Sequence, residues 1–227
     1  MISVIMPVFN GKKFIEEALQ SIENQGRTDF EVIVVDDGST DSTVKIVKTW
    51  PRPIQYIYQS NQGPAYARNV GIEAAKGDFI AFLDADDTWP LGKITTQIAL
   101  LNQYSAIELV WGKTNYFFEN EILSTQYEGY TMGVEPIFNA FLGAALFRKT
   151  TFDKVGLFDI TLRFGEDVDW YNRAREMKVG ILKSEDVGLF YRVHNHNSTH
   201  NTVALNQGTV QLLKKKLDRN RQINPHV

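Results

Sequence analysis

The chain has 227 residues, and its 24 Lys and Arg against 27 Asp and Glu give a formal net charge of −3. At roughly 150 residues per domain this length predicts one large domain, and 43% apolar with 22% charged residues is typical of a folded protein. The negative charge argues against a general nucleic-acid binder, which needs a basic surface. The absence of cysteine excludes disulfides, thiolate metal sites and a cysteine nucleophile, and it fits a reducing compartment.

The start of the chain lacks a basic segment followed by a long apolar run, so it does not read as a signal peptide. The apolar runs further along are too short or too interrupted to span a bilayer. These features predict a soluble, cytoplasmic protein.

Apolar runs and amphipathic segments alternate through the first half of the chain. The expected strands are 2–6, 30–35, 54–58 and 79–83, and the expected helices are 12–25, 42–50, 64–76 and 91–104. Continuous apolar strands that alternate with helices predict an α/β fold with a mostly parallel sheet covered on both faces.

The second half is less regular. We expect strands at 109–118, 144–147 and 187–194, and helices at 149–155, 167–178 and 202–221. Residues 119–136 carry few periodic signals and are expected to form a loop or short hairpin. No repeat and no change in composition divides the chain, so we predict a single domain.

Acidic residues follow two of the expected strands. Asp36 and Asp37 end the second strand, and Asp84, Asp86 and Asp87 follow the fourth. In a parallel sheet, ligands bind beyond the carboxyl ends of the strands. Three carboxylates there repel one another unless a cation is bound, and oxygen-rich clusters suit Mg²⁺ or Mn²⁺. Helix capping would explain Asp87 but not Asp84 or Asp86. For Asp36 and Asp37, a turn sequence is as good an explanation as a ligand site.

The end of the chain is basic. It carries a net +4, which leaves −7 for the rest, from Lys214, Lys215, Lys216, Arg219 and Arg221 against Asp218. A solvated helix face with cations near its C-terminus explains this pattern. The alternative is peripheral contact with an anionic membrane, at the inner face for a cytoplasmic protein.

Four segments carry a family resemblance: SVIMPVFNG, VIVVDDGSTDST, NQGPAYARNVGIEAAKGDFIAFLDADD and FGEDVDWYNRA, in that order within residues 2–198. Together they closely resemble the family-two inverting glycosyltransferases, which have the A-type, Rossmann-like nucleotide-sugar fold. Within one domain, 1–227, the resemblance implies a nucleotide-binding half (1–104), an acceptor-binding half (105–200), and a C-terminal helix and tail (201–227).

The resemblance implies an activity and roles for named residues. A sugar would pass, with inversion, from a UDP-linked or similar donor to a hydroxyl of a saccharide or lipid-linked acceptor, assisted by Mn²⁺ or Mg²⁺. The implied nucleotide site consists of Pro7, Val8, Asn10, Asp36, Asp37, Ser39, Arg68 and Asp84, with Asp36 accepting a hydrogen bond from the base. The implied metal ligands are Asp86, Asp84 and His194.

Asp167 is implied as the general base that accepts the proton of the acceptor hydroxyl. Its neighbours Glu166 and Asp169 are expected to raise its pKa. Without the resemblance, these residues read as first-turn acids that complement a helix dipole.

Three alternatives remain open on the residues alone. An apolar strand followed by Asp84-Ala85-Asp86-Asp87-Thr88 also fits a haloacid-dehalogenase-like phosphatase with Asp84 as nucleophile, although four strands precede a motif that normally opens that domain. The second alternative is a module that binds a nucleotide sugar without catalysis. A zinc cluster of His194, His196 and His200 is an alternative for the late histidines.

Overall fold

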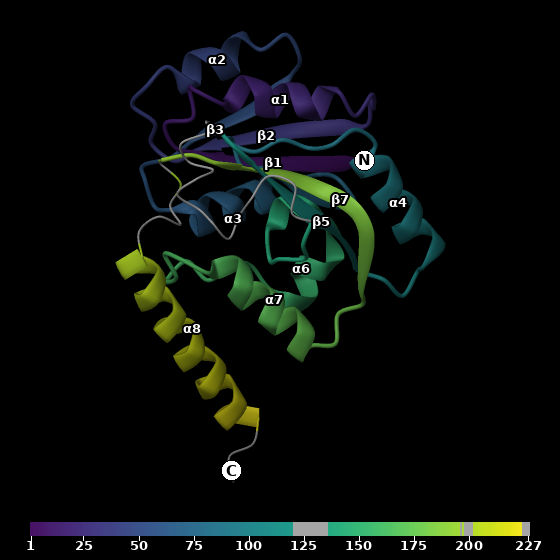
Figure 1. Cartoon of the computed structure of the whole chain (residues 1–227), viewed down its shortest axis with the longest axis vertical. Helices are drawn as coiled ribbons and strands as arrows, with labels where there is room; N and C mark the ends of the chain where they lie inside the picture. Colours follow the sequence, from purple (N-terminus) through teal and green to yellow (C-terminus); the bar gives the residue numbers. More distant parts are fainter. Residues whose placement is uncertain (120–135, 196, 198–201, 224–227) are drawn as a thin grey trace.

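The structure is a computed structural model that describes residues 1–119, 136–195, 197 and 202–223. The described residues form a seven-stranded sheet in the order β3-β2-β1-β4-β6-β5-β7 (Figure 1). The strands are β1 (Ile2–Val8), β2 (Phe30–Asp36), β3 (Ile54–Tyr58), β4 (Phe79–Phe82), β5 (Leu109–Phe118), β6 (Ala145–Arg148) and β7 (Ile181–Val193). The short β6 runs antiparallel to both neighbours and every other pairing is parallel, which confirms the predicted mostly parallel sheet.

Helices cover both faces of this sheet. They are α1 (Ile15–Glu23), α2 (Thr43–Thr49), α3 (Pro64–Ala74), α4 (Lys93–Gln103), α6 (Thr150–Val155), α7 (Glu166–Glu176) and α8 (Thr202–Ile223), with a 3-10 turn η1 (Leu142–Ala144) before β6. Helices α1 and α2 lie on one side of the sheet, and α3, α6 and α7 lie on the other (Figure 1).

The alternation of side chains along β1 divides the core into two layers. Val4 and Met6 are fully buried in the cluster that includes residues of α1 and α4. Ile5 points to the opposite face and joins the cluster that includes residues of α3 and α7. Gly71 of α3 packs directly on this strand, because a Cβ there would lie 2.3 Å from Cγ2 of Ile5. Each fully buried Ile contributes about 1.5–3 kcal/mol relative to an exposed one.

The largest errors in the predicted strand boundaries are at the end of the first strand and at the start of the last. The first strand was expected to stop before Pro7, yet β1 continues to Val8. The pairing of β1 with β4 ends at Ile5 and Phe82. Pro7 has no backbone N–H, but no residue of β4 lies opposite it to need that donor. The last strand begins at Ile181 rather than at residue 187. Its first residues lie on the edge strand and are half exposed, so they lack a continuous apolar pattern.

The parallel pairing brings the carboxyl ends of β1, β2 and β4 to one edge of the sheet. β7 returns to the same edge, where Thr88, just past β4, forms a bridge with Phe190. The sheet therefore takes strands from both predicted halves of the chain. The loop or hairpin expected at 119–136 lies, apart from its first and last residues, outside the described range. Among the described helices, none is long and apolar enough to cross a membrane.

Candidate active site

A buried arginine joins two acidic motifs that lie far apart in the sequence. Arg68, on α3, is 8% exposed. Its Nη2 donates to Oδ1 of Asp84 at 2.8 Å, and its Nη1 donates to Oε1 of Glu166 at 2.5 Å. Burial opposes the charge on Arg68, but the two carboxylates raise its pKa above the ordinary value. Arg68 thus fixes the first turn of α7 against the loop that follows β4.

The three aspartates after β4 point in different directions. Asp84 pairs with Arg68, and Oδ2 of Asp86 lies 3.0 Å from Nε2 of His194. Asp87 is 3% exposed and accepts the backbone N–H of Arg192 at 2.9 Å. Burial, followed by the charges of Asp86 and Asp84, raises the pKa of Asp87 well above its ordinary value. Asp87 is therefore not available at the open edge with the other two carboxylates, and it links this loop to β7.

The predicted metal ligands meet only in part. No group of three acidic or histidine side chains within the described ranges is arranged to hold a metal ion, because Asp84 is turned toward Arg68. Asp86 and His194 do fit a divalent cation, since they place a carboxylate oxygen and an imidazole nitrogen side by side. The Asp86 side chain is 34% exposed, so phosphate oxygens of a nucleotide can reach it and complete a ligand set.

Arg192 is a site residue that the sequence reasoning missed. Its guanidinium lies 4.6 Å from the ring centroid of Phe14 and 4.5 Å from that of Phe117. It also donates to the backbone carbonyl of Asp86 and to the carboxylate of Glu17. These contacts hold the Asp86 loop in place. The signal available in the sequence was the position of Arg192 two residues before His194, which the resemblance implies as a metal ligand.

Asp36, the predicted base reader, is 1% exposed at the end of β2. Its two oxygens accept hydrogen bonds from the backbone N–H of Ser39 and from the hydroxyl of Tyr56, both at 2.7 Å. Burial and the bond to Asp36 raise the pKa of Tyr56, which keeps the phenol protonated as a donor. Asp36 therefore shapes the turn after β2, and its contact with a base stays a prediction.

Asp37 holds the loop that leads into α3. It is 4% exposed, and its carboxylate accepts the side chain of Gln59 and the backbone N–H groups of Gln62 and Gly63, at 2.7 to 2.8 Å. The side chain thus points away from solvent and organises the site from within. Its contact with the nucleotide stays a prediction.

Replacing Asp37 by alanine is expected to lower the unfolding free energy by about 2–4 kcal/mol, because three donors lose a charged acceptor. The same substitution at the exposed Asp153 of α6 is the control and should change stability little. Urea unfolding of both variants measures the difference. Equal midpoints would show that the loop does not depend on Asp37.

The loops after β1 and β2 interlock through Asn10. Its backbone N–H donates to Oγ of Ser39 and its side-chain oxygen accepts the N–H of Thr40, both at 2.8 Å. Pro7 and Val8, by contrast, are buried within β1, so their side chains support the predicted base pocket rather than line it. The sequence reasoning passed over Phe9, which is 53% exposed beside Asn10.

Asp167, the predicted base, is the second residue of α7 and is half-buried. Its Oδ1 accepts the backbone N–H of Val168 at 2.7 Å. Burial first, and then the charge of Glu166, raise its pKa to about 7, although Arg68 opposes the shift. The expected contribution of Asp169 is wrong, because that buried carboxylate is neutralised by ion pairs with Arg173 and Arg219. A carboxylate with a pKa near neutrality suits proton transfer.

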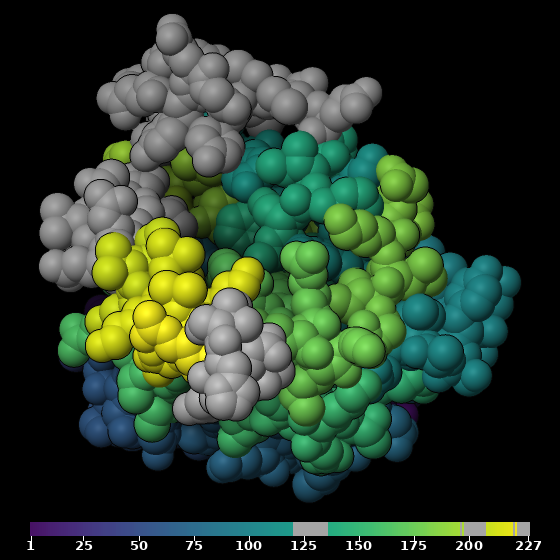
Figure 2. Space-filling view, turned by 90° about the horizontal axis from the view of Figure 1, so that it is seen from below, coloured from purple at the N-terminus to yellow at the C-terminus, as the bar shows by residue number. Residues whose placement is uncertain are grey.

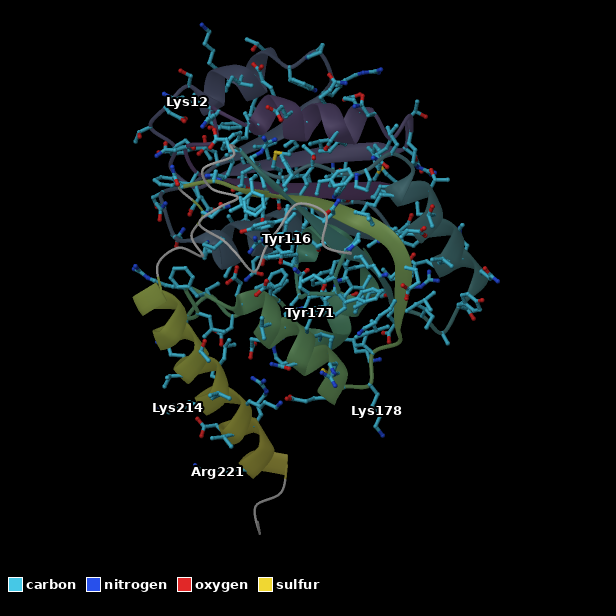
Figure 3. All side chains as sticks on the ribbon, viewed as in Figure 1. Lys12, Tyr116, Tyr171, Lys178, Lys214 and Arg221 are labelled. Carbon is cyan, nitrogen blue, oxygen red and sulfur yellow. The ribbon has the colours of Figure 1, made fainter. Side chains whose placement is uncertain are left out.

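Aromatic side chains fill the space between α7 and the sheet (Figure 3). Tyr171 stacks on Trp111 of β5 with ring centroids 4.5 Å apart, and Trp170 is fully buried in the core. The hydroxyl of Tyr171 and Nε1 of Trp111 are buried and have no partner within the described part of the chain. Of the late histidines in the zinc alternative, His196 and His200 lie outside the described residues.

The site combines a mostly parallel α/β sheet, acidic loops at its carboxyl edge and, on a facing helix, a carboxylate with a raised pKa. This arrangement is that of an A-type, Rossmann-like α/β fold with a candidate ligand site beyond the carboxyl ends of its strands. The family model described as Glycosyl transferase family 2 matches residues 3–170. The chain belongs to this family, so it is a glycosyltransferase.

Curated relatives agree with this assignment. An uncharacterized glycosyltransferase of Rickettsia typhi is 32% identical in an alignment of 220 positions that covers 91% of this chain and 68% of the relative. The uncharacterized glycosyltransferase EpsJ of Bacillus subtilis is 30% identical over 87% of this chain and 62% of its own length.

Solved structures share the fold. The mannosyltransferase PcManGT of Pyrobaculum calidifontis, in complex with GDP-Man and Mn²⁺, superposes with a TM-score of 0.73 at 20% identity over 96% of this chain and 64% of its own. S. aureus TarS 1–349 in complex with UDP-GlcNAc gives 0.69 at 22% identity, over 88% of this chain and 60% of its own. The family assignment and this fold show that the phosphatase alternative was wrong.

Proposed function

We propose that this glycosyltransferase moves a sugar from a UDP-linked donor to an acceptor hydroxyl in a single, inverting displacement. The observation that carries the proposal is the Asp84–Arg68–Glu166 bridge. It holds the turn that bears Asp167 against the acidic loop after β4, where the diphosphate of a donor would lie. The loops that contain Asn10, Asp36 and Ser39 would enclose the base and ribose.

The residues of the chain divide the chemistry between them. Asp167 would take the proton of the attacking hydroxyl, and its pKa of about 7 leaves much of it ionised at neutral pH. Glu166 is bound to Arg68 and would tune and orient its neighbour. A single base on one side of the sugar implies attack opposite the leaving diphosphate, so an α-linked donor would give a β-linked product.

Asp86 and His194 would hold a divalent cation, Mn²⁺ or Mg²⁺. When bound, such a cation supplies Lewis-acid stabilisation of the departing diphosphate. The bound ligands of the structural neighbours, GDP-Man with Mn²⁺ and UDP-GlcNAc, are consistent with this donor chemistry. We further propose a cytoplasmic enzyme of polysaccharide or cell-envelope synthesis. In support, a putative teichuronic acid biosynthesis glycosyltransferase of Bacillus subtilis is 37% identical over 46% of this chain.

Adding MnCl₂ together with UDP is expected to raise the melting temperature of the protein, because ligands that bind only the folded state stabilise it by mass action. Asp86→Asn should remove the metal-dependent part of the rise, while Asp153→Asn, an equal change on the exposed face of α6, should keep it. Thermal-shift measurements with and without chelator test this. A wild-type response to UDP that chelator leaves unchanged would exclude the metal role.

A binding module without catalysis was the second alternative that the residues alone left open. It predicts the same thermal shifts but no consumption of donor. Incubation with a panel of UDP- and GDP-sugars, followed by chromatography of the free nucleotide, separates the two. Release of UDP supports the enzyme, and stable binding without release supports the module.

A further inference from the structure

Helix α8 carries large apolar side chains on the side that faces away from the protein. Val210, Leu213 and Leu217 are 66%, 57% and 55% exposed. Their spacing of three and four residues places them on one face of the helix. Folded proteins normally turn such a stripe inward, so its outward position needs an explanation.

The opposite face of α8 is fixed to the catalytic part of the molecule. Gly208 and Leu212 touch Phe164 and Gly165, the two residues before α7. Arg219 pairs with Asp169 at 2.8 Å and with Glu176 at 3.0 Å, and Lys215 pairs with Asp159. The orientation of α8 is therefore set by contacts on its inner face, and the apolar stripe is held outward. In the space-filling view the yellow residues of α8 lie at the surface (Figure 2).

Basic residues border the apolar stripe. Helical spacing places Lys214 on one side of it, Lys216 on the other and Arg221 at its C-terminal end, and all three are exposed. Figure 3 labels Lys214 and Arg221 on the side of α8 that faces away from α7. The inward ion pairs occupy Lys215 and Arg219, so the outer cations are distinct from those that hold the helix.

We propose that this outer face of α8, defined by Val210, Leu213, Lys214, Lys216, Leu217 and Arg221, docks on the surface of an anionic bilayer. An apolar stripe between cations matches a lipid surface, where side chains enter the acyl boundary and cations meet phosphate headgroups. The helix would lie on the membrane, because no described helix qualifies as a membrane span.

Docking of α8 on a membrane would favour one class of acceptor. Gly165, in contact with Leu212 of α8, immediately precedes Glu166 and Asp167. A bilayer against the outer face would therefore lie one helix diameter, about 10 Å, from the catalytic turn. A saccharide attached to a lipid is the acceptor that such a distance favours. This part of the inference rests on the proposed sugar transfer, whereas the docking itself does not.

Cosedimentation with vesicles tests the docking without any enzymatic readout. The full chain should bind vesicles of phosphatidylcholine with phosphatidylglycerol and should not bind phosphatidylcholine alone. Lys214→Gln/Lys216→Gln should weaken binding about 30-fold, since two interfacial cations are lost. Lys45→Gln/Lys178→Gln, which removes one exposed cation on α2 and one in the turn after α7, should bind like the wild type. Leu213→Ser/Leu217→Ser should also weaken binding without unfolding the protein.

Three results would overturn the docking. The first is that the wild type does not bind the anionic vesicles, and the second is that the control variant loses as much vesicle binding as the Lys214/Lys216 variant. The third is a concentration-dependent dimer in ultracentrifugation that disappears in Leu213→Ser/Leu217→Ser, which would show that a second copy of the chain covers the apolar stripe. Donor hydrolysis in solution, with water as acceptor, should survive in every variant. Its absence in the wild type, with vesicle binding intact, would overturn the proposed function and leave the docking standing.

Discussion

Replacement of Asp167 by asparagine is expected to lower kcat by about 10²–10⁴-fold, the usual contribution of a positioned base. The amide keeps the shape of the side chain and its Oδ1 can still accept the N–H of Val168. The dissociation constant of the donor should change little, because Asp167 lies outside the proposed nucleotide loops. Calorimetry of donor binding beside turnover measurements separates the two effects.

The pH dependence of turnover provides a second measurement on the same residue. Because Asp167 must be ionised to accept a proton and its pKa is raised to about 7, activity should rise with pH through about 7 and fall below it. The Asn variant should lose this dependence. Burial disfavours the ionised carboxylate, so the variant should be no less stable than the wild type near pH 8. Near-normal turnover in the Asn variant would reassign the base to Glu166.

Replacement of Arg68 by methionine is expected to lower the unfolding free energy by about 3–5 kcal/mol, because Glu166 would keep a buried charge without a partner. The Arg68 and Glu166 side chains are each 9% exposed, whereas that of Asp84 is 43% exposed and is better hydrated. The Glu166 contact therefore carries most of the loss. Activity should also fall, since the turn that bears Asp167 would no longer be held against the loop after β4.

A double variant makes this prediction specific. Glu166→Gln in the Arg68→Met background removes the unpaired charge and should recover part of the lost stability. Denaturant unfolding of the wild type, the two single variants and the double variant would measure this recovery. Arg27→Met is the matched control, because Arg27 forms a surface pair with Asp29 and its loss should cost at most about 1 kcal/mol. Equal destabilisation by both methionine substitutions would remove Arg68 from its bridging role.

The sequence predicts the sheet well because its evidence is local. Continuous apolar runs such as Val32 to Val35 and periodic segments such as α1 mark themselves without reference to the rest of the chain. The boundaries that failed depend on neighbouring strands. Pro7 is tolerated within β1 because the adjacent β4 has already ended, a fact that no local pattern contains.

In the candidate site, too, local sequence marks some residues, whereas tertiary packing decides their partners. The acidic motifs and the resemblance identify residues that the structure gathers at one edge, but the partners of those residues are distant in sequence. Arg68 and Glu166 are separated by 98 positions, and Asp87 and Arg192 by 105. The sequence left both a ligand-facing role and a capping or turn role open for Asp37 and Asp87, and the structure buries both side chains. Which carboxylate faces a ligand and which supports a loop is decided by tertiary packing.

The stereochemistry of donor hydrolysis tests the central proposal most directly. With an α-linked UDP-sugar that the protein accepts and water as the acceptor, ¹H NMR follows the anomeric proton of the released sugar before mutarotation. The proposed mechanism predicts that the β anomer appears first and that Asp167→Asn slows its release by about 10²–10⁴-fold. Initial release of the α anomer, or an unchanged rate in the variant, would contradict inversion through Asp167.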